Sequence, residues 1–441
     1  MPTRLRCLRC GHDVVRVAAF SSFSLNRLAL SHDGRGGDAV RLHSPYCKEG
    51  FMPSRFLLPT LALAVFLVGA SEFMLSAMLA PLARVFAVAP ARAAWLVSSY
   101  ALAYALAAPV FGYLSDRMDR RRWLLLSLLL LAADHLALTL APNFEVALGL
   151  RMLGGLASAA LIPTAFALVA DTVRASRQSA AMGAVMAGMT FGLVAGPALA
   201  GVLAETWGWR MPFWTMAAGC VLTFGVARGA VTSTPPARAF AGSGAVRWLA
   251  QGRLVRLLLA KGLWNGAAVA GFLLAGEVLR HRHGLGTATV GLSVSVFGGG
   301  LFLGNLGIGS VRRLLSGDEA VLMAALWLLL PAMGAFMAAP LPLPAGLVCL
   351  SLWGFALGLA APASTALLAH RSGPDKGQVL AVSESLNNGV LLIVLPISAV
   401  QLEASGAVRA MLVLGAPLLA ALGLLLVKGR SASRRCVDGG M

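Results

Sequence analysis

Long apolar segments follow one another through most of this chain. Twelve of them fit between residues 56 and 427, each about 18 to 25 residues long, the length that crosses a hydrocarbon core as a helix. With 58% hydrophobic and 12% charged residues, a soluble protein of 441 residues would have more apolar surface than it can bury. The sequence therefore predicts an all-α integral membrane protein.

The expected helices fall into two sets of six on either side of a polar stretch. The domain organisation that follows is a polar extension (1–51), a six-helix bundle (52–229), a cytoplasmic linker (230–253), a second six-helix bundle (254–428) and a cytoplasmic tail (429–441). The expected helices are 56–80, 93–114, 123–141, 146–169, 180–204 and 212–229, then 254–278, 288–310, 320–339, 345–369, 379–402 and 408–427.

The two sets share landmarks at one offset. A shift of 199 positions aligns a glycine, two prolines and two basic positions between the halves. Such matches predict a duplicated six-helix unit, an arrangement in which secondary transporters place the substrate between the halves near the bilayer midplane. The aligned pairs are Gly155 and Gly354, Pro163 and Pro362, Arg177 and Lys376, Pro197 and Pro396, and Arg210 and Arg409.

Basic residues set the expected orientation. Nineteen Lys and Arg lie in the loops and C-terminal tail on one side of the expected helices, and six lie on the other. Cytoplasmic loops are enriched in Lys and Arg, so both chain ends are expected in the cytoplasm. The net charge of +18 is then explained by topology, and nucleic-acid binding is not expected.

Residues 1–51 differ from the rest of the chain, with eight Lys or Arg and three of the six cysteines. They have no apolar core of the kind a signal peptide needs. One interpretation is a disordered tail, or upstream sequence before a natural start at Met52. The alternative is a zinc site formed by Cys7, Cys10, His43 and Cys47.

Charge is concentrated in the turn after the second expected helix, GYLSDRMDRRRW (112–123). Its spacing resembles the loop signature of the major facilitator superfamily, although Asp119 stands where that family usually has glycine. The resemblance implies a cytoplasmic latch that holds helix ends together in the outward-facing state. The alternative is a turn whose positive charge only fixes topology. The latch residues are Gly112, Asp116, Arg117, Arg120 and Arg121.

The expected fifth helix carries small residues four apart, which let another backbone approach closely. Its glycines resemble the antiporter signature of proton-driven efflux pumps in the same superfamily, with Ala200 in place of one family glycine. Proline within it is expected to bend the helix. The alternative is a tightly packed helix without an antiport role. The matching residues are Gly183, Gly192, Gly196, Pro197 and Gly201.

Two acids are expected close to mid-bilayer. An acid in hydrocarbon costs about 2.5–3.5 kcal/mol on insertion scales, so it normally has a function. Glu72 lies in a stretch that resembles bacterial sugar-efflux and chloramphenicol-resistance permeases, and we expect it to bind and release protons; the alternative is an acid that faces a water-filled cleft without coupling. Two interpretations apply to Asp134, which lies beside His135: it contacts substrate or protons, or it forms a structural hydrogen bond.

Polar residues of three further helices complete the predicted site. Arg151 resembles the arginine motif of the family, with Gly154 in place of the usual glutamine; the alternative is that it reaches the interface. Glu384, Asn387 and Asn388 share one helix face by their spacing and are expected to line the cavity. Lys261, on the expected seventh helix, is a candidate to face them.

These features and the resemblance together imply a twelve-helix major facilitator transporter in two pseudo-symmetric six-helix bundles. We expect proton-coupled efflux of a small amphipathic molecule by a functional monomer in the bacterial cytoplasmic membrane. A facilitator or symporter on the same fold is the alternative, and a membrane sensor a further one. The sequence contains no P-loop, HExxH or GxSxG motif, so no enzyme activity, cofactor or metal is expected.

Overall fold

The computed structural model describes residues 56–115, 119–231, 247–315, 317–373 and 376–426. The chain divides into two units, Met1–Met52 and Pro53–Met441, and all described residues belong to the second. The predictions for 1–51, including the zinc alternative, therefore fall outside the described residues, as does most of the linker.

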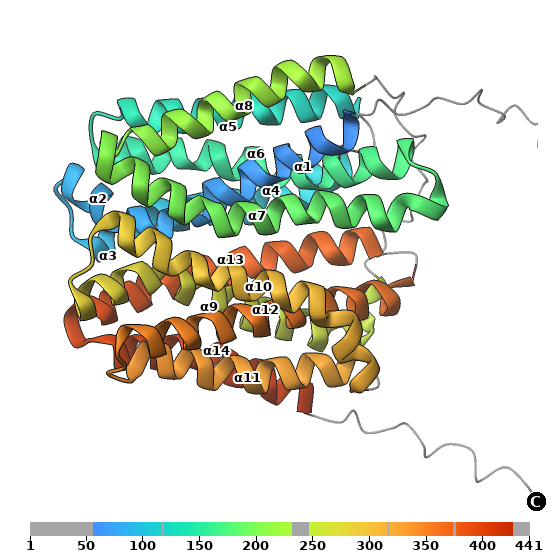
Figure 1. Cartoon of the computed structure of the whole chain (residues 1–441). Coiled ribbons are helices and arrows are strands. Elements are labelled where there is room, and N and C mark those ends of the chain that lie inside the picture. The colour runs from blue at the N-terminus through green and yellow to red at the C-terminus, as the bar shows by residue number, and fades with distance from the viewer. Residues whose placement is uncertain (1–55, 116–118, 232–246, 316, 374–375, 427–441) are drawn as a thin grey trace, which may run out of the picture. The chain divides into compact units, whose positions relative to one another are not determined.

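Helices account for nearly all of the described part of the first half (Figure 1). The first expected helix is two helices bent by 51° at a break after Phe73. The elements are α1 (Leu57–Phe73), α2 (Leu75–Val85), α3 (Pro90–Ala93), α4 (Trp95–Ser115), α5 (Arg120–Leu140), α6 (Phe144–Thr172), α7 (Ala175–Trp207) and α8 (Met211–Ala230).

The second half contains six long helices after one short 3₁₀ turn, η1 (Arg247–Ala250). Each of the six includes one of the ranges expected from the apolar segments, to within one residue, and half of them are longer by about a turn at one or both ends. They are α9 (Gly252–His283), α10 (Thr287–Leu314), α11 (Asp318–Ala338), α12 (Leu343–Arg371), α13 (Lys376–Ser405) and α14 (Ala407–Leu426).

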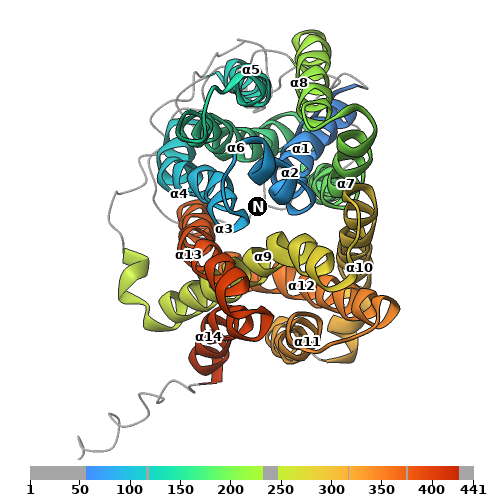
Figure 2. The same cartoon turned by 90° about the vertical axis from the view of Figure 1, so that its left-hand side faces the viewer.

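The helices from 57 to 230 lie together, and those from 252 to 426 lie together beside them (Figure 2). We call these groups the N-half and the C-half. Most of the contact between them comes from α7 with α10 and from α4 with α13. α4 and α10 belong to the second membrane spans of their halves, and α7 and α13 are the fifth spans. Exchanging the two halves therefore turns the contact of α7 with α10 into the contact of α13 with α4. The packing therefore has the two-fold relation that the duplicated landmarks predict.

Ten of the described helices are long and apolar enough to cross a membrane, and the bent pair α1–α2 would make an eleventh. The 20-residue α8 is not among them, although it packs along α5.

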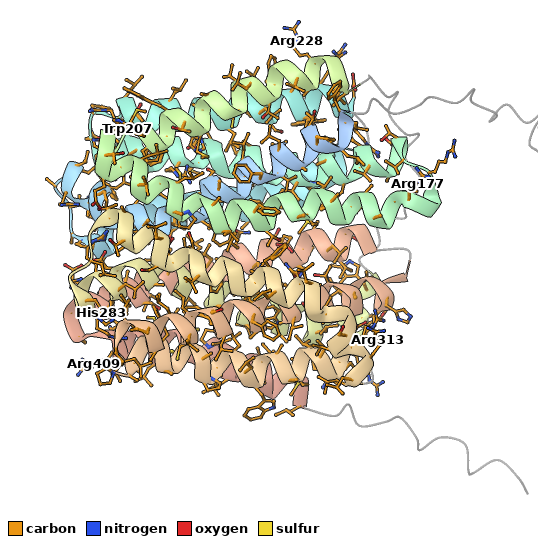
Figure 3. The ribbon with its side chains drawn as sticks, in the orientation of Figure 1. Arg177, Trp207, Arg228, His283, Arg313 and Arg409 are labelled. Carbon is orange, nitrogen blue, oxygen red and sulfur yellow. The ribbon has the colours of Figure 1, made fainter. Side chains whose placement is uncertain are left out.

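The bundle has two ends. We call one the termini end: α1 begins and α14 ends there, and Arg177, Arg228 and Arg313 lie there (Figure 3). Trp207, His283 and Arg409 mark the opposite end.

Candidate functional site

A buried ion pair joins α5 and α6 inside the N-half. Arg151 Nη1 lies 2.5 Å from Asp134 Oδ2, and both side chains are 0% exposed. The Asp134 carboxylate occupies the space next to Gly154, where a Cβ would lie 2.6 Å from Oδ2. Glycine at position 154 therefore makes room for the acid, and the pair keeps either charge from being buried alone.

Several polar atoms around this pair have no hydrogen-bond partner among the described residues. They are Asp134 Oδ1, Arg151 Nε and Nη2, and His135 Nε2. His135 Nδ1 lies 2.6 Å from the Leu131 carbonyl oxygen, which favours the tautomer with its proton on Nδ1 and leaves Nε2 as an acceptor. Buried polar groups are usually paired, so these atoms mark a place able to bind protons or polar groups.

The C-half holds a second polar cluster, on α9, α12 and α13. Lys261 Nζ lies 3.1 Å from Thr365 Oγ1 and 3.3 Å from Glu384 Oε1. The lysine side chain is 3% exposed and the glutamate side chain 44%, so the acid is the accessible member of this pair. Asn387 donates to Glu384 Oε2 at 3.4 Å, while Asn388 donates to the backbone oxygen of Glu384 at 3.0 Å.

Glu72 lies within electrostatic range of charges in both clusters. It is the next-to-last residue of α1, directly before the bend, and its side chain is half-buried. The charges of Glu384 in the C-half and Arg151 in the N-half both act on its carboxyl group. Glu72 forms no ion pair with a described residue, whereas Asp134 and Glu384 each have a basic partner.

Two aromatic residues on α4 belong to this region and were not among the site residues predicted from the sequence. Tyr100 and Tyr104 lie one turn apart and are 1% and 7% exposed. The Arg151 guanidinium lies 5.2 Å from the Tyr100 ring centroid, and the rings of Tyr100 and Tyr104 lie 6.3 Å apart. The chain has only four tyrosines, so two of them one turn apart in an apolar segment were an available signal.

The glycines of α7 do not all have one role. Gly192 and Gly196 pack against α1, since a Cβ would lie 2.7 Å from Ala70 N at the first and 2.9 Å from Ala70 Cα at the second. Gly201 instead packs across the halves, where a Cβ would lie 2.6 Å from the Thr287 oxygen of α10. Gly183 has nothing within 4 Å of its Cβ position, and Pro197 lies inside α7 without interrupting it.

The predicted cytoplasmic latch is only partly described. Asp116, Arg117 and the surroundings of Gly112 fall outside the described residues. Arg120 binds the Asp171 carboxylate, and Arg121 Nη2 donates to the Arg228 oxygen at 2.6 Å. These contacts join α5 to α6 and to α8, all in the N-half.

Asp119, the departure from the family pattern, has a role of its own in this turn. Its Oδ1 accepts a hydrogen bond from the Arg121 backbone N–H at 3.0 Å, so it caps the start of α5.

The described residues contain no group of three or more His, Cys, Asp or Glu side chains able to hold a metal ion.

Comparison with known proteins agrees with this architecture. A family model described as the Major Facilitator Superfamily matches residues 61–315. A chloramphenicol resistance protein of Streptomyces lividans is 32% identical over 254 residues, covering 55% of this chain and 63% of that protein. A multidrug resistance protein, Stp, of Mycobacterium tuberculosis is 33% identical over 153 residues, covering 34% and 28%. The chain thus matches less than two thirds of the length of either relative.

Solved structures share the fold at low sequence identity. A D-xylose–proton symporter superposes with a TM-score of 0.71 at 16% identity, covering 83% of this chain and 96% of that one. A bacterial homologue of the human lysosomal transporter Spinster, inward-facing and occupied, gives 0.69 at 17%, covering 85% and 96%. The family model covers more than half of the sequence and the helices pack in two related halves: the chain is a multi-pass membrane protein that belongs to the major facilitator superfamily.

Proposed function

We propose that this transporter exports a small amphipathic molecule in exchange for protons. Glu72 carries the proposal: it is an acid between two charged clusters, one in each half, without an ion-pair partner among the described residues. The names of the relatives, chloramphenicol and multidrug resistance proteins, support drug-like compounds as the substrates. The termini end is cytoplasmic in this proposal, the membrane is the bacterial cytoplasmic membrane, and the working unit is a monomer.

The charges explain why Glu72 would be the coupling acid. Arg151 neutralises Asp134 and Lys261 neutralises Glu384, so the ionised Glu72 leaves the cluster with one net negative charge. A proton bound to Glu72 brings the cluster to neutrality. Substrate and proton then compete for one state of the site, and each drives the conformational change because it binds the two states unequally.

Asp134, Arg151, Glu384, Asn387 and Asn388 support this exchange in different ways. The N-half pair holds polar atoms that have no partner among the described residues, close to the aromatic ring of Tyr100, where a polar part of the substrate can bind. In the C-half, Asn387 and Asn388 fix the rotamer and backbone position of Glu384 by hydrogen bonds from the same helix. The half-exposed Glu384 is therefore the accessible counterpart of Glu72 across the interface.

Transport in vesicles tests the proposal. Expression in a drug-hypersensitive bacterium first selects a substrate, beginning with chloramphenicol. In vesicles that are acidic inside and hold the protein with its termini end outward, antiport predicts uptake of that compound and alkalinisation of the lumen. Glu72→Gln should abolish the proton movement, whereas Glu319→Gln, at an exposed acid paired with Arg371 within the C-half, should not.

The same assay separates the alternatives. A facilitator would equilibrate the compound without moving protons, and a symporter would move both in the same direction. Counterflow that persists at full rate in Glu72→Gln with unchanged proton movement would remove Glu72 from the mechanism.

A further inference from the structure

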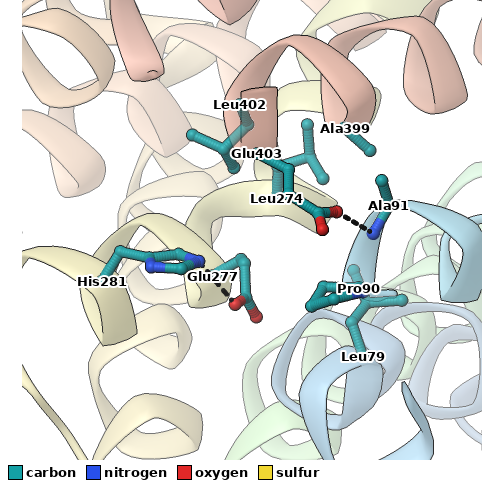
Figure 4. Close-up of a pocket in the computed structure, with 9 residues that line it drawn as sticks. All are labelled: Leu79, Pro90, Ala91, Leu274, Glu277, His281, Ala399, Leu402 and Glu403. Atoms are coloured by element: carbon teal, nitrogen blue, oxygen red, sulfur yellow. Dashed lines mark hydrogen bonds and ion pairs between the residues drawn. The ribbon is translucent and has the colours of Figure 1, made fainter. Parts of the chain in front are cut away.

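Two carboxylates at the opposite end of the bundle cross from one half to the other. Glu205, in the last turn of α7, accepts a hydrogen bond from the Ala288 backbone N–H at 2.6 Å, in the first turn of α10. Glu403, in the last turn of α13, accepts one from the Ala91 N–H at 3.1 Å (Figure 4). Ala91 lies in the first turn of the membrane span Pro90–Phe111.

These two contacts, which we call the cross-half caps, are related by the internal repeat. Glu403 follows Glu205 by 198 positions, and Ala288 follows Ala91 by 197, close to the offset of 199 between the sequence landmarks. Each cap connects the fifth membrane span of one half to the start of the second span of the other, which in the N-half is α3, the first turn of the span Pro90–Phe111. The same contact is therefore made twice, once in each direction across the interface.

Both capped helices lack a cap of their own. The residues that precede them, Ala89 and Gly286, make no side-chain hydrogen bond to the first turn. By contrast, Asp119 and Asn143 cap α5 and α6 from within the same half. The first N–H groups of a helix have no internal partner and carry its positive end, so a carboxylate there forms a charge-assisted bond. Here the opposite half supplies it.

The surroundings of the caps favour close approach. Gly201, one turn before Glu205, lets α7 touch the start of α10, and a Cβ on Gly286 would lie 3.1 Å from Glu205 Oε2. Glu403 lines a small pocket between the halves that also contains Glu277 and His281, whose own ion pair of 3.0 Å stays within α9 (Figure 4). Both caps thus lie where the halves meet.

We propose that Glu205 and Glu403 form a two-fold gate that holds the opposite end closed and is released when the halves separate there. Their role is positional: each carboxylate acts on a helix backbone and does not contact the substrate site. Only the use of this gate in a transport cycle rests on the proposed function. Whether the caps hold the end closed is a property of the protein without substrate or proton gradient.

Distance measurements by double electron–electron resonance test the gate. Spin labels at Leu140→Cys and Val408→Cys, both exposed and near the opposite end in different halves, report its opening in full-length protein with the other cysteines replaced. Replacing Glu205 and Glu403 together by alanine should raise the ratio of open to closed molecules about tenfold, since each charge at a helix N-terminus contributes a few-fold. Each single replacement should raise the ratio of open to closed molecules about threefold or more.

Matched variants make the result decisive. Glu145→Ala removes a carboxylate at the same end whose ion pair with Arg92 stays within the N-half, and it should leave the distances unchanged. Glu205→Gln and Glu403→Gln keep a hydrogen-bond acceptor but remove its charge. Their ratio of open to closed molecules should lie between that of the wild type and that of the alanine variants, so they decide the question even if the double variant does not assemble. Unchanged distances in the cap variants, or an equal shift in Glu145→Ala, would overturn the proposed gate. A failure of proton coupling in vesicles would count against the proposed function and would leave the gate in place.

Discussion

Lys261 and Glu384 form an ion pair in which the base is buried and the acid is not. The lysine side chain is 3% exposed, the glutamate side chain 44%, and the two charges lie 3.3 Å apart. Burying a lysine is costly unless it is paired, so this arrangement points to the glutamate as the group that the protein keeps accessible. Thr365 and Asn387 add one hydrogen bond each to the pair.

Replacing Lys261 by methionine should therefore impair transport more than folding. Without the ammonium group the charge of Glu384 loses its basic partner, and we expect the transport rate to fall about tenfold, equivalent to about 1.4 kcal/mol in the activation free energy. The side chain of methionine fills most of the same volume, and the remaining Glu384 can reach solvent, so the melting temperature should change little. Initial transport rates and thermal unfolding of the purified protein check both parts. Lys261→Arg, which keeps the charge, should retain more activity than Lys261→Met; equal rates in both would contradict the role of the charge.

The Asp134–Arg151 pair should behave in the opposite way. Asp134→Asn leaves the arginine buried and uncompensated, and breaking such a pair costs about 3–5 kcal/mol. We expect poor expression and a clearly lowered melting temperature. Adding Arg151→Leu should recover part of the loss, because no unpaired charge then remains. A double variant less stable than Asp134→Asn alone would show that the pair is not the reason for the loss.

Gly154→Ala tests the space beside the same pair. Its Cβ would come 2.6 Å from Asp134 Oδ2, so the carboxylate must move, and overpacking of this kind costs about 1–3 kcal/mol. Gly149→Ala on the same helix is the control, since nothing lies within 4 Å of its Cβ position. Thermal unfolding of the two variants should differ by several degrees, and similar melting temperatures would mean that α6 does not hold Asp134 in this position.

The glycines of α7 offer a second matched pair. Gly192→Ala should disturb the contact with α1, where a Cβ would lie 2.7 Å from Ala70 N, while Gly183→Ala meets nothing within 4 Å. We expect the first change to cost about 1–3 kcal/mol and the second to be near neutral in stability. If Gly183→Ala alone abolishes proton-coupled transport in a stable protein, that glycine has an antiport role beyond packing.

Sequence alone was enough for the helices but not for the geometry of the site. Apolar length predicted the twelve helical segments, because in lipid each span must satisfy its own backbone hydrogen bonds. The family resemblance, carried by the spacing in α7 and the 112–121 turn, is confirmed by the family model. Which side chains meet between neighbouring helices depends on helix rotation, which apolar runs do not specify. Thus Lys261 was only a candidate to face Glu384, and its partner Thr365 was not expected at all.

Local breaks were equally hard to foresee. Nothing in the apolar run 56–80 signals that the helix ends at Phe73 and resumes at Leu75, since apolar residues stand on both sides of the break. The cross-half caps were invisible for another reason. Glu205 and Glu403 lie at helix ends, where acids are common, and only the packing of α7 on α10 and of α3 on α13 shows which N–H groups they reach.

The bend between α1 and α2 has a consequence for the proposed coupling. Beyond the elbow at Met74, α2 packs on α9 and α10 of the C-half as well as on α7, so the elbow directly after Glu72 joins a helix of the N-half to the surface of the C-half. If the halves part at that end, α2 loses its contacts with α9 and α10, and the surroundings of the neighbouring carboxyl group change with them. An acid at a joint of this kind responds directly to the separation of the halves, as the proposed exchange requires.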